Sequence, residues 1–388
     1  MIDSMQKREY LELPTEKGIK FYLRREPLVP IYEELEDFLN FDHNMDNLHF
    51  AKKMLFSHEI KANNQVEGYG YDLGVVEAVI KKKTDRIKDE DVRKRILNLY
   101  RGYQYILKHH EVDAKHLKEL YQILSKDILE ERDLQRMGEF YRMAPVYILR
   151  NGRVDTELEE GTNWQNIARL MDYYFDFFNN ANFSQNMTDE YIKSQILHFY
   201  FVYIHPYFDV NGRTSRTMAL WHLLNKGAYP YIIFNRGIGF AGSSYDRIIR
   251  EAKGTCDITY FLRFMLETVK LELEKESVMQ TIASNTHYKL SGIDYQTMLY
   301  LLSMNGAKTV GDFVHFYNNL NDKKKSKDIF EEMLLPLIEA DILEVVKYSK
   351  KMLGDNFPNM FLEFNSSLVP EEEEKHLKRL KTFQSSKK

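Results

Sequence analysis

The sequence is poor in several residue types, and each shortage excludes a class of protein. Its 388 residues include one cysteine, Cys256, so no disulfide framework can form within the chain. The 54 lysines and arginines are balanced by 58 aspartates and glutamates, which gives a formal net charge of −4 and indicates neither a nucleic-acid nor a membrane partner. No run approaches the roughly 20 apolar residues of a membrane span, and the polar first residues lack a signal-peptide core. We therefore expect a cytoplasmic protein without a membrane partner.

Apolar residues with helical spacing are abundant instead. The hydrophobic share of 44% can build a large core, and the length suggests two to three domains. The spacing predicts helices over residues 48–59, 73–82, 89–109, 114–129, 163–178, 189–205 and 259–278. We expect a mostly α protein, with an N-terminal arm of short extended pieces over 1–49, a helical domain over 50–285, a small α+β domain over 286–366 and a charged tail over 367–388.

Residues 205–216 read His-Pro-Tyr-Phe-Asp-Val-Asn-Gly-Arg-Thr-Ser-Arg. Pro206 predicts that a helix ends at His205, because proline disfavours helical geometry in the residue before it. An imidazole is suited to accept a proton from a hydroxyl at neutral pH. Asp209 offers a hard oxygen ligand of the kind that Mg²⁺ takes beside phosphates and water. The segment therefore outlines a site that handles phosphates.

The second half of this segment supplies donors for an anion. Asn211 and Gly212 can hold a turn whose N–H groups converge on phosphate, and a helix follows over 213–225. Arg213 and Arg216 are three residues apart, so they share a helix face. Taken singly, each residue is as well explained as a turn former, a packed histidine or a solvated arginine. Their joint order favours the phosphate site.

The segment resembles the signature of the Fic family, His-Pro-Phe-x-Asp/Glu-Gly-Asn-Gly/Lys-Arg with a second Arg three residues on. The resemblance implies a helical fold that transfers AMP from ATP to a protein hydroxyl, with His205 as the base and Asp209 on Mg²⁺. It also implies a nucleotide site formed by Asp209, Val210, Asn211, Gly212, Arg213, Thr214, Ser215, Arg216, Tyr245, Val146, Tyr147 and Ile148.

Three positions of the segment stand out against this pattern. Tyr207 replaces Phe and adds a hydroxyl that needs a partner. Val210 replaces Gly, and since a β-branched residue avoids positive φ, we expect the turn to have an ordinary negative φ there. Gly212 stands where the family's phosphorylating Doc branch has Lys, which favours AMP transfer.

Two further segments resemble the family. Residues 138–149, followed by Asn151-Gly152, resemble its flap, a β-hairpin that docks the target by strand addition, and the Asn-Gly pair after an alternating apolar run is itself a hairpin signal. Residues 243–249 resemble a helix start that contributes an aromatic, here Tyr245, to the adenine pocket.

Residues 63–68, Asn-Asn-Gln-Val-Glu-Gly, resemble the family's inhibitory motif within an expected helix over 60–80. The resemblance implies that Glu67 pairs with Arg216 and blocks the γ-phosphate, which a carboxylate would also repel. Asn63 stands where Ser or Thr is usual. The alternative is a surface glutamate on a helix. The family's inhibitory Glu can also serve in hydrolysis, so removal of AMP by the same site stays open.

Beyond residue 290, helical segments near 296–304, 310–318 and 327–340 precede extended runs over 342–347 and 360–364. This order resembles a winged helix. Lys323, Lys324, Lys325 and Lys327 form a candidate phosphate patch for DNA, although the nearby acidic residues favour a solvated loop.

The sequence therefore predicts an autoinhibited protein adenylyltransferase that uses ATP and Mg²⁺ on a target hydroxyl, with self-modification and a homodimer as open possibilities. Two alternatives remain: a related phosphotransferase, and a DNA-binding regulator with a repurposed Fic fold.

Overall fold

The computed structural model describes residues 7–40, 49–71, 73–80, 87, 89–148, 159–228, 235, 238, 243–286, 308–320, 324–353 and 357–365. It divides into two compact units. The first comprises Met1–His43, Leu55–Tyr71 and Val75–Lys270, and the second comprises Asn44–Met54, Asp72–Gly74 and Leu271–Lys388. Helices dominate the described chain, which confirms the mostly α class. None of these helices is long and apolar enough to cross a membrane.

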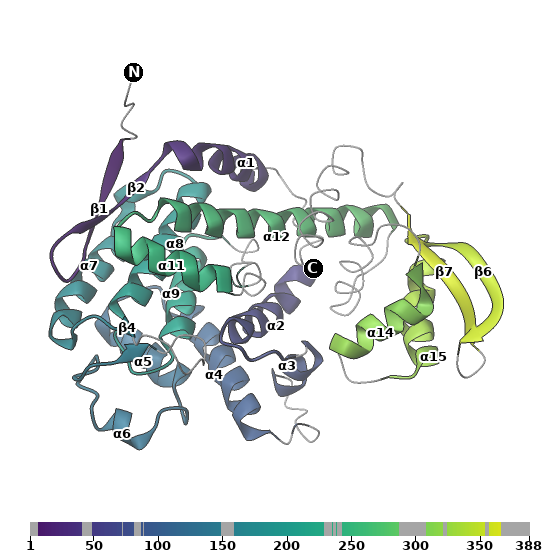
Figure 1. Ribbon diagram of the computed structural model, residues 1–388, viewed down its shortest axis with the longest axis horizontal. Helices are drawn as coiled ribbons and strands as arrows, with labels where there is room; N and C mark the ends of the chain where they lie inside the picture. The colour runs from purple at the N-terminus through teal and green to yellow at the C-terminus, as the bar shows by residue number, and fades with distance from the viewer. Residues whose placement is uncertain are drawn as a thin grey trace. The chain divides into compact units, whose positions relative to one another are not determined.

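Two antiparallel helices, α8 (Met187–Ile204) and α9 (Asn211–Asn225), form the centre of the first unit. They pack on each other and are surrounded by α7 (Ile167–Asn179), α4 (Glu90–Ile106) and α5 (Ala114–Leu124), as Figure 1 shows. Helix α8 is apolar around most of its circumference and almost wholly buried, as expected for a helix enclosed by others. The loop between α8 and α9 carries the candidate site.

The N-terminal segment packs on α8 as ordered structure. Strands β1 (Arg8–Pro14) and β2 (Lys20–Arg24) pair antiparallel, and the buried Phe21 ring lies 5.2 Å from that of Phe199 on α8. The short helix η1 (Glu26–Leu28) then leads into α1 (Val29–Asn40). Helix α1 was not expected in this segment, which was predicted as short extended pieces; Pro30 lies in its first turn, where proline is tolerated.

The expected single helix over 60–80 is wrong. Helix α2 (His49–Val66) ends just before Glu67, Gly68 has a φ of +84°, and α3 (Leu73–Ile80) starts afresh. Glycine tolerates this left-handed geometry and commonly ends helices in this way. Glu67 therefore lies in the turn after α2 and not inside a helix.

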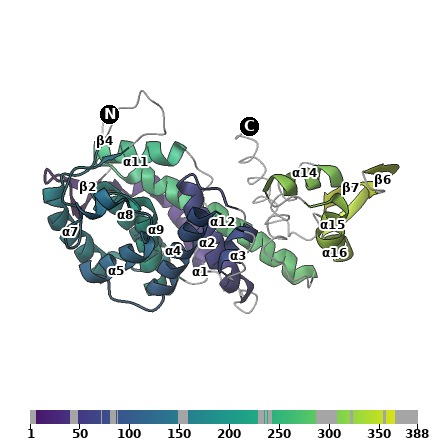
Figure 2. The same cartoon turned by 90° about the horizontal axis from the view of Figure 1, so that it is seen from below.

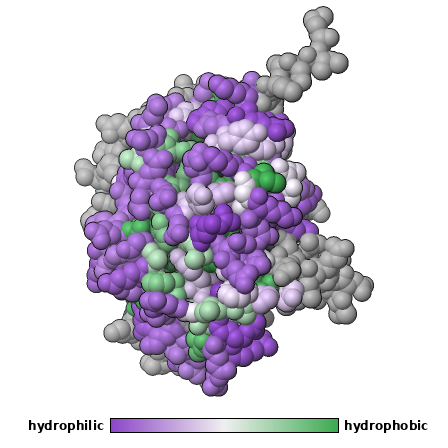
Figure 3. Space-filling view, turned by 90° about the vertical axis from the view of Figure 1, so that its left-hand side faces the viewer, coloured by the Kyte–Doolittle hydropathy of each residue, from purple (hydrophilic) through white to green (hydrophobic). Residues whose placement is uncertain are grey.

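Short helices, a strand pair and two longer helices complete the first unit, and the last helix, α12, continues into the residues of the second unit. Short helix α6 (Glu131–Leu134) precedes the pair of strands β3 (Tyr147–Ile148) and β4 (Glu159–Glu160). Helices η3 (Trp164–Asn166) and η4 (Ala181–Phe183) flank α7, and α11 (Ser243–Thr255) precedes α12 (Thr259–Thr286). The left-hand face of the molecule in Figure 3 is mainly hydrophilic, with scattered apolar spots.

The second unit contains β5 (Lys308–Thr309), α14 (Val310–Leu320), α15 (Ser326–Ile329), the π-helix η5 (Phe330–Leu334) and α16 (Leu335–Glu339). Strands β6 (Leu343–Leu353) and β7 (Phe357–Phe364) follow as a hairpin beside these helices (Figure 2). The antiparallel sheet has the order β5-β7-β6. The helix expected over 296–304 lies outside the described residues, and the winged-helix assignment stays a prediction.

Candidate functional site

His205 lies at the junction between α8 and the loop, as predicted from Pro206. It is the C-terminal cap of α8 in a left-handed conformation, with φ 53° and ψ 60°, and its N–H donates to the Phe201 carbonyl at 2.9 Å. Burial, together with the positive charges of Lys253 and Arg142, lowers the pKa of His205 to about 3. The imidazole is therefore neutral at pH 7, the form that can accept a proton.

The expectation of a negative φ at Val210 is wrong. Val210 has a φ of 64°, and it caps the N-terminus of α9. Its N–H donates to Oδ1 of Asp209 at 2.6 Å, and its carbonyl accepts from Thr214 N at 2.9 Å and Thr214 Oγ1 at 2.8 Å. These bonds and the buried side chain hold a geometry that costs a β-branched residue about 1–2 kcal/mol. Tertiary contacts thus override the local preference.

Asn211 fixes the shape of the loop. Its Oδ1 accepts from the N–H of Tyr207 at 3.0 Å, and its Nδ2 donates to the Tyr207 carbonyl at 2.8 Å. The Tyr207 ring stacks on Tyr121 with centroids 3.5 Å apart. Its extra hydroxyl finds no hydrogen-bond partner among the described residues. Helix α9 then begins at Asn211, two residues earlier than expected, so its free N–H groups and positive dipole end face the loop.

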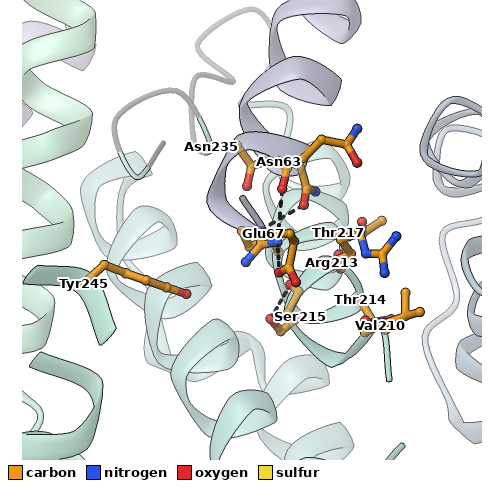
Figure 4. Close-up of polar contacts among 12 residues, drawn as sticks. Asn63, Glu67, Val210, Arg213, Thr214, Ser215, Thr217, Asn235 and Tyr245 are labelled. Carbon is orange, nitrogen blue, oxygen red and sulfur yellow. Dashed lines mark hydrogen bonds and ion pairs between the residues drawn. The ribbon is translucent and has the colours of Figure 1, made fainter. Parts of the chain in front are cut away.

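The Glu67 carboxylate lies over this helix start. A Cβ built on Gly212 would come closer to Glu67 Oε1 than any two such atoms normally approach. Glu67 Oε1 also accepts from Nη2 of Arg216 at 2.5 Å. Figure 4 shows Glu67 pointing from the end of α2 toward the first turn of α9. A carboxylate thus occupies the place where a helix N-terminus binds an anion.

Arg216 is 1% exposed and is held at three points by α2 and the turn that follows it. Besides Glu67, its Nε donates to Asn63 Oδ1 at 2.9 Å, and its Nη2 donates to the Asn63 carbonyl at 3.2 Å. Burial would raise the pKa of Glu67, but Arg216 and Arg213 outweigh it and lower that pKa. The sequence analysis missed Asn63 as a partner of Arg216, although its spacing of four from Glu67 places both on one side of a helix.

Arg213 and Asp209 remain available to a ligand. The Arg213 side chain is buried, and its Nε has no hydrogen-bond partner in the described part of the chain. Burial lowers the pKa of Arg213, while Glu67 and Asp209 oppose that effect. Asp209 is exposed. Within the described residues, no group of three or more His, Cys, Asp or Glu side chains could hold a metal alone. The exposed Asp209 carboxylate, whose Oδ1 accepts from Val210 N, suits Mg²⁺ that takes its other ligands from phosphates and water.

The other predicted nucleotide residues are placed as follows. The hydroxyls of Thr214 and Ser215 donate to the carbonyls of Val210 and Gly212 within α9. Tyr245 on α11 is 6% exposed, points toward Arg216, and shares a short hydrogen bond with the buried His198. Its role in an adenine pocket stays a prediction.

The segment predicted as a flap is described up to Ile148 and again from Glu159. Strands β3 and β4 pair antiparallel through Tyr147↔Glu160 and Ile148↔Glu159, which agrees with the predicted hairpin. Tyr147 is 55% exposed, and the Val146 carbonyl accepts from Gly161 N at 2.9 Å. Asn151 and Gly152, predicted as the turn, lie outside the described residues.

Residues 111–223 match the family model described as the Fic/DOC family. This chain carries a Fic/DOC family domain. Members of the family generally transfer a nucleotide monophosphate to proteins and are typically transferases. The matched residues include the flap base, His205 and Arg216. Glu67 and Tyr245 lie outside them.

The likeness to one solved structure supports the fold. A Fic family protein from Desulfovibrio desulfuricans G20 is 19% identical, with a TM-score of 0.55, and the alignment covers 88% of this chain and 96% of that one. Fic-1 (residues 134–508) from C. elegans is 17% identical over 66% of this chain and 73% of that chain, with a TM-score of 0.49. No curated protein matches the chain.

Proposed function

We propose that this Fic-domain protein transfers AMP from ATP·Mg²⁺ to a hydroxyl of a target protein, and that Glu67 inhibits the transfer. The observation that carries the proposal is the place of the Glu67 carboxylate, over Gly212 at the N-terminus of α9 and 2.5 Å from Nη2 of Arg216. An internal anion there indicates that the site binds anions. It also indicates that a triphosphate must displace or avoid this carboxylate, because like charges repel.

The residues of the loop supply the chemistry. The hydroxyl oxygen of the target attacks the α-phosphorus, and its proton passes to the neutral imidazole of His205. The bond from the α-phosphorus to the α,β-bridging oxygen breaks, and pyrophosphate leaves. Helix-terminal N–H groups and the guanidinium of Arg213 stabilise the charge that develops on the phosphate oxygens. Because its pKa is lowered to about 3, His205 is in the neutral form that this step needs.

Asp209 would hold Mg²⁺, which when bound neutralises charge on the leaving phosphates. The fit rests on one exposed carboxylate beside the buried Arg213 and the start of α9. Asp209 would supply one ligand of the metal, and oxygens of the bound nucleotide would supply most of the others.

The label position in ATP separates AMP transfer from phosphorylation. We expect protein labelling from α-labelled ATP and none from γ-labelled ATP. Labelling from the γ position alone would replace the proposal by a phosphotransferase. Gly212, where the phosphorylating branch carries Lys, supports the first outcome.

The DNA-binding alternative is not favoured. Lys324 pairs with Glu332, and Lys327 lies 3.6 Å from Glu331, so two of the four lysines of the candidate patch have acidic neighbours, while Lys323 lies outside the described residues. A salt-dependent shift of DNA that is lost when these lysines are neutralised would revive it.

A further inference from the structure

Arg142 is a buried cation that the proposed reaction does not use. It is 1% exposed and lies between α6 and β3. Its Nε donates to the His205 carbonyl at 2.9 Å, its Nη1 to the Ala144 carbonyl at 2.7 Å, and its Nη2 to the Thr162 carbonyl at 2.5 Å. Its main-chain N–H donates to the Pro206 carbonyl at 3.0 Å. One side chain thus joins the entry of the flap, its exit and the end of α8.

The end of α8 needs such a partner. His205 has a φ of 53°, a conformation that costs a residue other than glycine about 1–2 kcal/mol. The last carbonyls of a helix lack intrahelical donors and form the negative end of its dipole. The guanidinium supplies both a donor and a positive charge there. It therefore stabilises the His205 peptide in a geometry that the chain alone would not favour.

The contacts of Arg142 on the side of the predicted flap are also specific. Gly161 N donates to the Val146 carbonyl at 2.9 Å, and Thr162 Oγ1 donates to the Tyr203 carbonyl in the last turn of α8 at 3.0 Å. A Cβ on Gly161 would lie 2.7 Å from Val146 Cγ1 and 3.3 Å from Arg142 Nη2. Gly161 thus leaves the space in which the guanidinium reaches Thr162.

We propose that Arg142 is a positioning residue for His205. Its hydrogen bonds hold the base and both flanks of the predicted flap in one geometry. The inference rests on the proposed function, in which the flap docks the target and His205 accepts its proton. Arginine suits the role because its planar fork directs donors to several acceptors at once, whereas a lysine ammonium presents a single point. The charge of Arg142 also contributes, after burial and Lys253, to the lowered pKa of His205.

The activity test uses Arg142→Gln and Arg142→Lys in a Glu67→Gly background. We expect Arg142→Gln to lower the initial rate of AMP incorporation by roughly 10²-fold at saturating ATP, because a misplaced base loses catalysis steeply. The ATP concentration for half the maximal rate should stay the same, since the start of α9 is untouched. Arg142→Lys should keep part of the rate. A rate for Arg142→Gln within about twofold of the background would overturn the proposal.

The matched control is Lys193→Gln. Lys193 is also 1% exposed, and its Nζ donates to the carbonyls of Phe178 and Asn180 at the end of α7, at 3.0 and 2.6 Å. It is therefore a second buried cation at a helix end of the same unit. We expect it to lower the melting temperature without lowering the rate. Equal losses of rate in Lys193→Gln and Arg142→Gln would show that general destabilisation explains both and would overturn the proposal.

A second readout does not need activity. The pKa of His205 can be followed by NMR of the imidazole nitrogens, with His205→Ala for assignment. The proposal expects a higher pKa in Arg142→Gln than in the parent, and no change in Lys193→Gln. An unchanged pKa would overturn it even if AMP transfer fails for every variant. If Arg142→Gln does not fold, the imidazole nitrogens are compared in Arg142→Lys, which keeps the charge but loses the fork, so their chemical shifts should change while the pKa stays close to that of the parent; unchanged chemical shifts would overturn the proposal.

Discussion

Glu67 and Arg216 form an ion pair at 2.5 Å across 149 residues of sequence. The pair brings the turn after α2 onto the first turns of α9, within the segment that carries the Fic signature. Arg216 is 1% exposed, so its charge is compensated by Glu67 and by the two bonds to Asn63. This relationship is the structural basis of the inhibition that we propose.

Asn63 should be a second inhibitory contact. Asn63→Ala removes the acceptor of Arg216 Nε but leaves the main-chain bond, so we expect a partial rise in the rate of AMP transfer. The effects of Asn63→Ala and Glu67→Gly should not add, because both act on one arginine. The measurement is a double-mutant cycle of initial rates. Strict additivity of the two effects would show that Asn63 and Glu67 do not act through the same arginine.

Gly212→Ala should weaken the contact between Glu67 and Arg216 from the α9 side. A methyl group there would meet Glu67 Oε1 and would lie 3.1 Å from Arg216 Nη1, so the carboxylate has to retreat. Because the methyl group also stands where a phosphate is proposed to bind, we expect the rate of Glu67→Gly to fall, whereas in the parent the weakened contact with Glu67 opposes this fall, so the ratio of the two rates should shrink by several-fold. Gly254→Ala on α11 is the control, since its Cβ would have no neighbour within 4 Å. An equal change in both backgrounds would rule out this explanation.

The rate of AMP transfer should not fall as the pH is lowered through 6.5. Because the pKa of His205 is lowered to about 3, its imidazole stays neutral from pH 5 to 9. The pKa of Glu67 is lowered too, so the carboxylate stays charged over the same range and inhibition persists. Rates of parent and Glu67→Gly, measured from pH 5 to 9 at saturating ATP, check both points. A fall centred near pH 6.5 that follows the titration of His205 would contradict the assignment.

Stability should decrease as the pH falls below about 6.5. Burial lowers the pKa values of His198, His205 and His222, so in this range the unfolded chain binds more protons than the folded one. Each such histidine lowers the free energy of unfolding by about 1.4 kcal/mol per pH unit between its unfolded and folded pKa values. Urea unfolding at several pH values measures the slope. His222→Gln should reduce it, and an unchanged slope would show that His222 does not titrate as described.

Local pattern predicted where α8 ends and α9 begins around residues 205–216, because these residues are contiguous, while their roles in a site stay a prediction. His205 to Arg216 span twelve positions, and Pro206 alone places the end of α8 correctly. The spacing of apolar residues likewise predicted α4 and α7 to within a few residues. These features depend on neighbours in the sequence.

Features that arise only in the folded chain were missed. The φ of 64° at Val210 depends on bonds to Asp209 and Thr214 that only the folded loop provides. The break after α2 follows from a positive φ at Gly68. Arg142 appears in the sequence as one arginine in a mixed run, and nothing local shows that its acceptors include the carbonyls of Thr162 and His205.

The central claim is that Glu67 restrains a transfer carried out by His205. The most direct measurement compares the initial rate of labelling from α-labelled ATP and Mg²⁺ in lysate for the parent, Glu67→Gln, Glu67→Gly and Glu67→Gly/His205→Ala. Glu267→Gln, which removes an exposed partner of Arg263, is the matched control. The account predicts a rise of about tenfold or more in both Glu67 variants, no change in the control, and loss of labelling in the double variant. Labelling that is unaffected by Glu67, or that persists without His205, would contradict it.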